Sequence, residues 1–328
     1  MVSGPIHTVQ PLDVALPKGR LVAVTGVSGS GKTTLILESL IPALQRQADG
    51  QPLPGHVLAI EGGGIRRVHL IDAAPIGANV RSTVATYSNV LDDLRRVYAA
   101  LPAAKEKGYG MKDFSYNTGS LRCPACDGTG QITMDVQFLP DVAVTCPACG
   151  GSRYGKEAAA IRRPAKDGGQ GLSLPELIAL TVEQALEAVK NVKKVRDRLQ
   201  TLVDLGLGYL TLGEATPALS GGEAQRLKLA AEIGRGQDEA LFVFDEPTIG
   251  LHPLDVRSLI AIFQRLIDQG ATVIVIEHDL DMIANADYII DMGPGGGAQG
   301  GRIVAAGTPG DIAAAPQSAT GRYLRPLL

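Results

Sequence analysis

The stretch Gly26-Val27-Ser28-Gly29-Ser30-Gly31-Lys32-Thr33 has the full G-x-x-x-x-G-K-T spacing of a loop that binds nucleotide phosphates. An apolar, β-branched run at 20–24 precedes it, and an apolar segment at about 32–45 follows it. This pattern predicts a strand, a glycine-rich turn and a helix. A chance Gly/Ser turn is the alternative, and it is disfavoured because the motif lies between a strand and a helix.

Each part of this loop has a chemical reason. Glycines let successive backbone N–H groups turn inward around a β-phosphate, and the next helix adds its positive N-terminus. Lys32 brings a point charge to the β- and γ-phosphates, and Thr33 offers a hydroxyl to Mg²⁺. We therefore predict ATP and Mg²⁺ as cofactors, with the nucleotide held by Gly26, Ser28, Gly29, Ser30, Gly31, Lys32, Thr33 and Thr34.

The composition is that of a globular protein long enough for two domains. The chain has 328 residues, of which 45% are apolar and 20% charged. Its formal net charge of −3 argues against a wholly basic nucleic-acid binder but allows a local basic patch. No apolar run approaches the roughly 18 residues of a membrane span. The first residues also lack a secretion-signal pattern, so we expect a cytoplasmic location and no membrane partner.

Short apolar strands alternate with helical stretches, which indicates an α/β fold with a parallel sheet covered by helices. Further buried strands are expected at 241–244 and 271–276. Residues 88–200 hold 16 Lys and Arg against 13 Asp and Glu, whereas the flanks are net acidic. This change indicates an inserted domain. The expected boundaries are 1–87 and 216–328 for the core and 88–215 for the insertion, with a zinc module at about 120–155.

Two local patterns refine this expectation. Ser173-x-x-Glu176 and Thr181-x-x-Gln184 fit capping boxes, and they predict two helices between 173 and 198. The segment 293–301 is rich in glycine, and we expect it to be a loop rather than a working part.

An acidic pair and a histidine follow the two later strands. In Asp245-Glu246, one carboxylate can hold Mg²⁺ and its neighbour can orient and deprotonate an attacking water. Alone, such a pair is more often a solvated strand end, but Lys32 in the same chain favours the catalytic interpretation. The place of His278 in the chain order fits a contact to the γ-phosphate. The predicted catalytic residues are Glu246, His278 and Lys32, and the predicted magnesium ligands are Thr33 and Asp245.

The run Leu219-Ser220-Gly221-Gly222-Glu223-Ala224-Gln225 resembles the signature of ABC-type ATPases and opens a helix expected to reach about 235. Ser220 and the N–H groups of Gly221 and Gly222 would form an anion site at the helix N-terminus. In the ABC arrangement such a turn serves the nucleotide of a partner cassette. We therefore predict that Ser220, Gly221 and Gly222 bind a nucleotide across a dimer.

The four cysteines form two Cys-Pro-Ala-Cys pairs, Cys123/Cys126 and Cys146/Cys149, separated by 19 residues. Four thiolates at this spacing can close a tetrahedral zinc site, which leaves no position open for water. A structural zinc ion is therefore expected. The alternative is four reduced, buried thiols.

The residues resemble the UvrA family, the damage-recognising ABC ATPases of bacterial nucleotide-excision repair, and the chain is similar to their C-terminal half. The marks of this resemblance are Gly26–Thr34, Ile71-Asp72-x-x-Pro75-Ile76-Gly77, Phe138-Leu139-Pro140-Asp141, Leu219–Leu227, Asp245-Glu246-Pro247-Thr248-x-Gly250-Leu251-His252 and Gly307-Thr308-Pro309. A zinc hairpin between phosphate loop and signature is not a feature of ordinary transporter cassettes.

The resemblance implies an ABC-type P-loop NTPase with an inserted, mainly helical domain that carries a zinc hairpin. ATP would be bound and hydrolysed by a homodimer or with a second UvrA-type cassette. The inserted domain would lie along double-stranded DNA, through phosphate contacts that position without reading sequence. Each basic residue taken singly is more often a solvated charge. The candidates for these contacts are Arg122, Arg153, Lys156, Arg162 and Arg163, of which Arg153 and Lys156 are favoured.

Three departures from the family pattern matter. The chain has one cassette and lacks the UvrB-docking domain, which argues against a UvrB-type partner. Ala73 stands where the family has a Gln that meets Mg²⁺ and the attacking water, which bears on the hydrolysis rate. The family's Arg-x-Asn-Asn-Leu run is replaced by residues 6–10.

Two other functions remain open at this stage. One is a module that binds ATP, scarcely hydrolyses it, and uses its zinc domain for protein contacts. The other is a transporter cassette, against which the zinc hairpin and the basic insertion argue.

Overall fold

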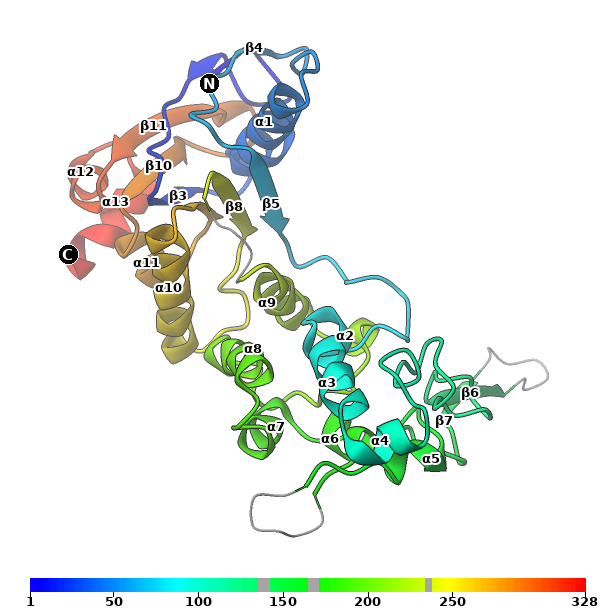
Figure 1. Ribbon diagram of the computed structural model, residues 1–328. Helices are drawn as coiled ribbons and strands as arrows, with labels where there is room; N and C mark the ends of the chain where they lie inside the picture. Colours follow the sequence, from blue (N-terminus) through cyan, green and yellow to red (C-terminus); the bar gives the residue numbers. More distant parts are fainter. Residues whose placement is uncertain (135–141, 165–170, 234–237) are drawn as a thin grey trace. The chain divides into compact units, whose positions relative to one another are not determined.

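The computed structural model describes residues 1–134, 142–164, 171–233 and 238–328. They form two compact units (Figure 1). Unit 1 is Met1–Ala73 with Ile233–Leu328, and unit 2 is Ala74–Glu232. Unit 2 contains the whole of the expected insertion, 88–215, whose exact boundaries stay a prediction. The motif at 138–141 lies outside the described residues.

A six-stranded sheet in the order β11-β10-β3-β9-β8-β5 organises unit 1. Five neighbouring strands are parallel, and β11 pairs antiparallel with β10. The strands are β3 (Leu21–Gly26), β5 (Arg67–Ile71), β8 (Ala240–Asp245), β9 (Thr272–Ile276), β10 (Tyr288–Gly293) and β11 (Arg302–Gly307). The three strands expected from apolar runs are present, and the α/β class is confirmed. Both faces of the sheet are buried, as expected for parallel strands: Val22, Val243 and Ile274 lie on one face, and the alternate residues Ala23, Phe244 and Val275 lie on the other.

Helices cover this sheet, and a small sheet, β2-β1-β4, packs beside it. The helices of unit 1 are η1 (Thr34–Leu40), α1 (Ile41–Ala48), α10 (Pro253–Asp268), α11 (Leu280–Ala284), η3 (Gly297–Gln299), α12 (Pro309–Ala314), α13 (Ala319–Leu324) and η4 (Arg325–Leu327). The strands of the small sheet are β1 (Val2–Ser3), β2 (Leu12–Asp13) and β4 (Val57–Ala59). None of the described helices in either unit is long and apolar enough to cross a membrane.

The helix after the phosphate loop departs from the expected regular form. It begins as a π-helix, η1, and becomes α-helical at α1, which ends at Ala48 rather than near residue 45. Pro42 explains the change, because it has no N–H to donate and its ring excludes the carbonyl four residues earlier. The Ser39 hydroxyl also donates to the Thr34 carbonyl at 3.0 Å, which fills the widened turn.

Unit 2 is mainly helical and carries a two-stranded hairpin, β6-β7. Its elements are α2 (Val84–Tyr87), α3 (Val90–Ala99), α4 (Pro102–Glu106), β6 (Gln131–Met134), β7 (Val142–Thr145), α5 (Lys156–Ala159), α6 (Leu174–Ile178), α7 (Val182–Ala188), α8 (Lys193–Asp204), η2 (Thr216–Ala218) and α9 (Gly221–Glu232). Buried Asp93 on α3 joins it to α8, because it accepts from Arg198 at 2.8 Å and Lys194 at 3.0 Å.

Both predicted capping boxes form, at Ser173 and at Thr181. The predicted number of helices was wrong, since three helices, α6, α7 and α8, lie here rather than two. The helical structure is interrupted after α7 at residues 189–192, and Val192, the N-cap residue of α8, makes no side-chain cap. Without a capping residue, the start of α8 had no signal in the sequence.

Candidate functional site

The phosphate loop follows the carboxyl end of β3, in the position that the motif predicts. Gly26, Gly29 and Gly31 have positive φ angles of 128°, 74° and 101°, a region that side-chain-bearing residues rarely adopt. At Gly26 a Cβ would also stand 2.0 Å from the Met292 carbonyl oxygen of neighbouring β10. These glycines are therefore required by the backbone path.

Lys32 is 6% exposed, and its ammonium group donates to the carbonyls of Gly26 at 2.9 Å and Val27 at 3.1 Å. Burial lowers the pKa of Lys32, while the carboxylates of Glu246, Asp245 and Asp291 act in the opposite direction. The side chain thus curls over the loop with its charge facing the acidic end of the sheet. An anion bound inside the loop would offer the Lys32 ammonium group a full negative charge in place of these two carbonyl dipoles.

Asp245 and Glu246 lie at the carboxyl end of β8, and His278 follows β9, so the parallel sheet brings all three to the edge that carries the phosphate loop. His278 Nε2 is 3.6 Å from Glu246 Oε1, and both side chains are partly exposed. Glu246 has φ +48°, an uncommon backbone conformation for a residue with a side chain. These predicted residues are therefore gathered in one unit.

The electrostatics at Asp245 fit a divalent cation. Burial raises the pKa of its carboxyl group, and the neighbouring carboxylates of Glu246, Asp72 and Glu277 raise it further, against the effect of Lys32. A site where several carboxylates repel one another is relieved by a bound cation of high charge. Oxygen donors of this kind are also those that Mg²⁺ prefers.

Two buried acids at this edge were missed by sequence reasoning. Glu277 is 2% exposed and accepts four hydrogen bonds, from the N–H and hydroxyl of Thr248 and the N–H groups of His278 and Asp279. Its position directly before His278 was the one available signal. Asp291, at 1% exposure on β10, accepts from the hydroxyls of Ser318 at 2.5 Å and Thr320 at 3.0 Å.

In unit 2 the signature turn begins α9, which ends at Glu232, earlier than expected. Glu223 closes a capping box on it: Ser220 N–H donates to Glu223 Oε2 at 2.7 Å, and Glu223 N–H donates to Ser220 Oγ at 3.4 Å. The Tyr209 hydroxyl donates to the other oxygen of Glu223 at 2.5 Å. Ser220 and Gly221 are exposed, so the N-terminus of a twelve-residue helix is accessible.

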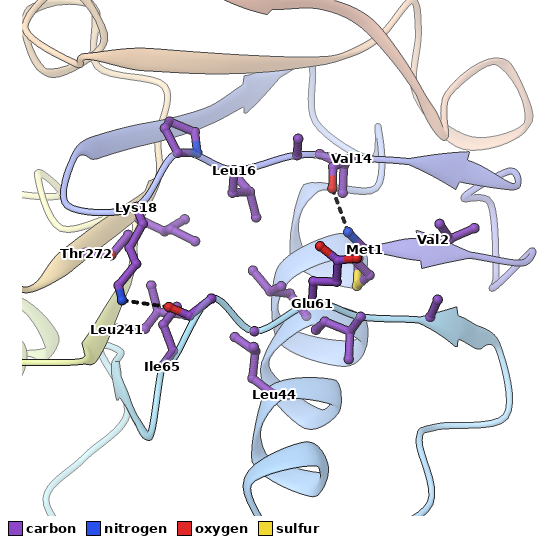
Figure 2. Close-up of a pocket in the computed structure, with 18 of the residues that line it drawn as sticks. Met1, Val2, Val14, Leu16, Lys18, Leu44, Glu61, Ile65, Leu241 and Thr272 are labelled. Atoms are coloured by element: carbon purple, nitrogen blue, oxygen red, sulfur yellow. Dashed lines mark hydrogen bonds between the residues drawn. The ribbon is translucent and has the colours of Figure 1, made fainter.

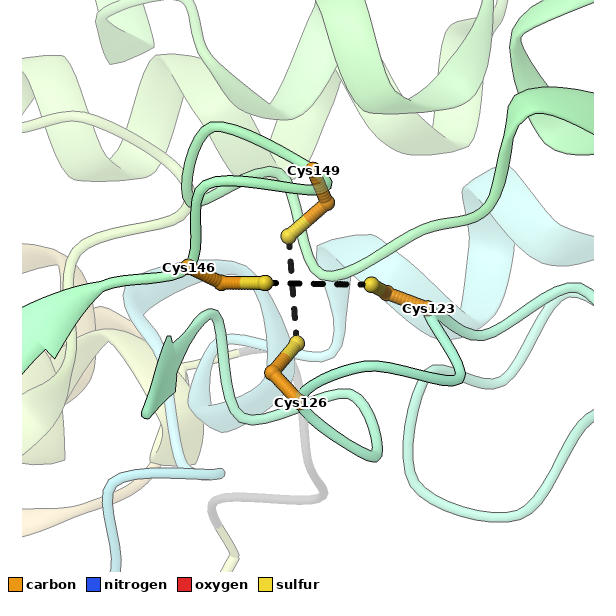
Figure 3. A group of neighbouring side chains, drawn as sticks. All are labelled: Cys123, Cys126, Cys146 and Cys149. Atoms are coloured by element: carbon orange, nitrogen blue, oxygen red, sulfur yellow. Dashed lines mark hydrogen bonds between the residues drawn. The ribbon is translucent and has the colours of Figure 1, made fainter. Parts of the chain in front are cut away.

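The four cysteines meet at one point, with all four sulfurs turned toward a common centre (Figure 3). The Sγ atoms lie within 4.8 Å of one another, at 4.0 Å for Cys123–Cys146 and 3.8 Å for Cys126–Cys149. A tetrahedral zinc ion with bonds of about 2.3 Å needs sulfurs about 3.8 Å apart. The donor set therefore fits zinc, and the two printed sulfur pairs already have a spacing close to that of a tetrahedral site.

The backbone around the cysteines has the tight turns of such a site. Gly128 and Gly150 have positive φ, and their N–H groups donate to the carbonyls of Cys123 and Cys146. Burial raises the pKa of the Cys149 thiol to about 12. At Cys126 burial also raises the pKa, but the hydrogen bonds from the Gly130 N–H at 3.3 Å, the neighbouring cysteines and the Gly128 N–H together outweigh it, and the pKa falls to about 7. A metal ion would hold all four as thiolates.

The five side chains predicted to contact DNA differ in how exposed they are and in whether they already have partners within the protein. Arg153 is 5% exposed, donates to the Val80 carbonyl at 2.9 Å and lies 5.2 Å from the centre of the Tyr116 ring, so its contacts are internal. Arg122 pairs with Asp127 at 3.0 Å beside a groove of about 610 Å³, Arg162 pairs with Glu176, and Arg163 bonds to Asn191. Lys156 is exposed, with no hydrogen bond or ion pair to the described part of the chain. DNA contact by all five stays a prediction, and Lys156 has the side chain best placed for it.

A cavity of about 490 Å³ lies elsewhere in unit 1, near the amino ends of β8 and β9 (Figure 2). Its walls include apolar side chains such as Leu44 and Leu241, and Lys18 closes one side by donating to the Gly63 carbonyl at 2.6 Å. None of the predicted site residues lines it. The cavity therefore lies at the amino-terminal edge of the parallel sheet, and the phosphate loop lies at its carboxyl-terminal edge.

The sequence of this chain is 46% identical over 325 residues to UvrABC system protein A of Bacillus subtilis (strain 168), covering 98% of this chain and 33% of that protein. It is 45% identical over 321 residues to the protein of the same name from Thermus thermophilus, covering 97% and 33%. No protein-family model matches the chain.

The fold gives the same result. The crystal structure of UvrA2 from Deinococcus radiodurans superposes with a TM-score of 0.85 at 41% identity, covering 99% of this chain and 39% of that one. The chain thus spans about a third of the length of the curated relatives that it matches. With this identity over nearly its whole length and with this fold, the chain is similar in sequence and structure to one part of the UvrA proteins.

Proposed function

We propose that this chain binds and hydrolyses ATP, binds double-stranded DNA, and acts in the recognition of DNA damage in nucleotide-excision repair. The observation that carries the proposal is the gathering of Lys32, Asp245, Glu246 and His278 at one edge of the sheet. The similarity to UvrABC system protein A supports the repair role.

Each residue would have the role that its chemistry suits. Lys32 and the N–H groups of the loop Gly26–Thr33 would bind the phosphates, and Thr33 and Asp245 would hold Mg²⁺, which neutralises phosphate charge when bound. Glu246, with His278 3.6 Å away, would orient and deprotonate the attacking water. Burial of Lys32 strengthens its attraction for a phosphate, because less water screens the charges.

The signature turn would act across a dimer of this chain, or with a second UvrA-type cassette. The exposed N-terminus of α9, with Ser220 and Gly221, offers N–H groups to a γ-phosphate. The capping box between Ser220 and Glu223 holds this turn ready before any nucleotide arrives. We place the working protein in the cytoplasm.

Unit 2 would contact DNA around the cysteine cluster, where a structural zinc ion would hold the hairpin β6-β7. Exposed Lys156, close in sequence to Cys149, is the leading phosphate contact. Such contacts suit a protein that responds to distorted DNA rather than to a base sequence.

Ala73 favours one alternative, a chain that binds ATP but hydrolyses it slowly. It lies two residues after β5, next to Asp72, and its methyl group offers no polar atom to water or metal. A slow ATPase would still use its nucleotide to pair two chains.

The deciding experiment measures ATP turnover by the full chain alone, with intact duplex DNA and with duplex DNA carrying a bulky lesion. Turnover stimulated by DNA, and lost in Lys32→Ala, supports the proposal. Tight ATP binding with no turnover in any condition supports the slow alternative. A chain that bound neither ATP nor DNA would overturn both.

A further inference from the structure

The glycine-rich segment Gly295–Gly301 packs directly on the phosphate loop, although the two are far apart in the sequence. The Gly297 N–H donates to the Gly29 carbonyl at 3.0 Å, and the Gly301 N–H donates to the Ser30 carbonyl at 2.9 Å. Both bonds join backbone to backbone. The contact therefore depends on side chains in one respect only, which is that they must be small enough for the two backbones to come close.

The approach is close enough to require glycine. A Cβ added to Gly296 would stand 2.5 Å from the Ser28 carbonyl oxygen, and one added to Gly300 would stand 3.0 Å from Ser30 Cα. These neighbours are backbone atoms of the phosphate loop, which cannot swing aside as a side chain can. The phosphate loop therefore requires glycine at position 296. At position 300 it does so together with the carbonyl oxygen of Gly295, which a Cβ would meet at 2.7 Å.

The far side of the segment is also held. The Gln10 N–H donates to the Gly301 carbonyl at 2.9 Å, and Arg302 Nε donates to the Gln10 side chain at 3.3 Å. Gly301 has φ +78°, and a Cβ there would stand 1.9 Å from the Thr8 carbonyl oxygen. The segment is therefore clamped between the turn at 6–10 and the phosphate loop.

We infer that Gly295–Gly301 is a positioning layer for nucleotide binding, which sets the peptide planes of the phosphate loop in their phosphate-binding orientation. A trans peptide is planar, and its C=O and N–H point in opposite directions. Holding the Ser30 carbonyl on Gly301 therefore turns the Gly31 N–H, next to Lys32, away from the segment. The inference rests on the proposed binding of ATP by this loop.

The test compares the affinity for Mg-ATP and Mg-ADP of the full chain and of Gly296→Ala and Gly300→Ala, by calorimetry. Gly55→Ala is the matched control, because a Cβ there meets nothing within 4 Å and φ is not positive. All three share the effect of alanine on the unfolded chain. We expect Kd to rise about tenfold or more in the first two variants and to stay unchanged in the control.

Melting of the nucleotide-free proteins separates positioning from simple packing. A variant that melts earlier but keeps the Kd of the unaltered chain would show that the segment only stabilises the fold, and it would overturn the inference. Unaltered chain that bound no nucleotide would instead overturn the proposed function, and the inference with it.

Hydrogen exchange on the unaltered chain covers the case in which both variants fail to fold. Mg-ADP should slow exchange of the Gly297 and Gly301 amides, which touch the loop's carbonyls. If nucleotide protects the phosphate loop but leaves exchange at these two amides unchanged, the inference is overturned.

Discussion

The buried carboxylate of Glu277 accepts the hydroxyl of Thr248 at 2.6 Å, and this bond ties the turn after β8 to the turn after β9. The same carboxylate accepts the N–H groups of Thr248 at 2.9 Å, His278 at 2.7 Å and Asp279 at 3.0 Å. Charged acceptors make short, strong hydrogen bonds, and four of them satisfy a carboxylate that is removed from water. Glu277 thereby fixes the backbone from which His278 reaches toward Glu246.

We predict that Glu277→Gln lowers ATP turnover about tenfold or more while Mg-ATP affinity changes little. The amide replaces one accepting oxygen by a donor, so two of the four donors lose their acceptor, at about 1–3 kcal/mol for each group left unpaired. Glu277 accepts no hydrogen bond from Lys32, whose ammonium donates to Gly26 and Val27. Steady-state kinetics with calorimetry of Mg-ATP binding measures both quantities.

The control for this variant is Glu61→Gln, which makes the same chemical change at an exposed position. It should leave turnover and melting temperature unchanged. Equal losses of affinity and turnover in Glu277→Gln would indicate general unfolding, and the positioning role would then be wrong.

Glu246→Gln should bind ATP, stall hydrolysis and favour a dimer. The amide keeps the size of the side chain but cannot take a proton, and loss of a general base costs about 10²–10⁴ in rate. Lys32→Ala is the paired variant, and it should lose ATP binding because the phosphate charge loses its partner. Mass in solution, followed with and without ATP, distinguishes the two. A Glu246→Gln monomer with undiminished turnover would contradict the dimeric mechanism.

The sheet and the core of this site could be predicted because their signals are local. Short apolar runs mark β8 and β9, and the spacing of 26–33 marks the phosphate loop. Parallel pairing then brings Asp245, Glu246 and His278 to one edge without further information. The cysteine spacing likewise determined which four sulfurs would meet.

What the sequence concealed depends on contacts between distant residues. Glu277 is important because it accepts a hydrogen bond from Thr248, and Gly296 must be glycine because it lies against Ser28. Neither pairing leaves a pattern in either segment of the sequence. Arg153 looked like a DNA contact because it is basic and near the cysteines, but its neighbours Val80 and Tyr116 lie much earlier in the chain. Charge alone did not show that this side chain is buried.

Each chain should carry one zinc ion, and Cys146→Ser should lose it. Cys146 is fully buried and faces Cys123 at 4.0 Å, so a hydroxyl in its place weakens the site and loosens the hairpin β6-β7. Elemental analysis measures the metal, and limited proteolysis measures the loosening. Mg-ATP affinity should survive, because the phosphate loop belongs to unit 1. Metal analysis that finds no zinc in the unaltered chain would remove this assignment.

Asp291→Asn should stabilise the protein at neutral pH. Burial raises the pKa of Asp291, against the effect of the Ser318 and Thr320 hydroxyls and of Lys32. Since the folded pKa exceeds the unfolded value, the folded state holds its proton longer, and stability falls as the pH rises through the folded pKa. Asparagine has no charge to bury. One hydroxyl can still donate to its remaining carbonyl oxygen, and the other can reverse its role and accept from its NH2 group.

The measurement for Asp291→Asn is the melting temperature of both proteins across pH. The curves should lie together near pH 4 or below, where an unfolded Asp is itself protonated at about 3.9. They should separate as the pH rises, with the variant melting a few degrees higher. A variant that melts lower than the unaltered chain at neutral pH, by an amount that grows with pH, would mean that the ionised carboxylate stabilises the fold, in which case its closeness to Lys32 outweighs its burial.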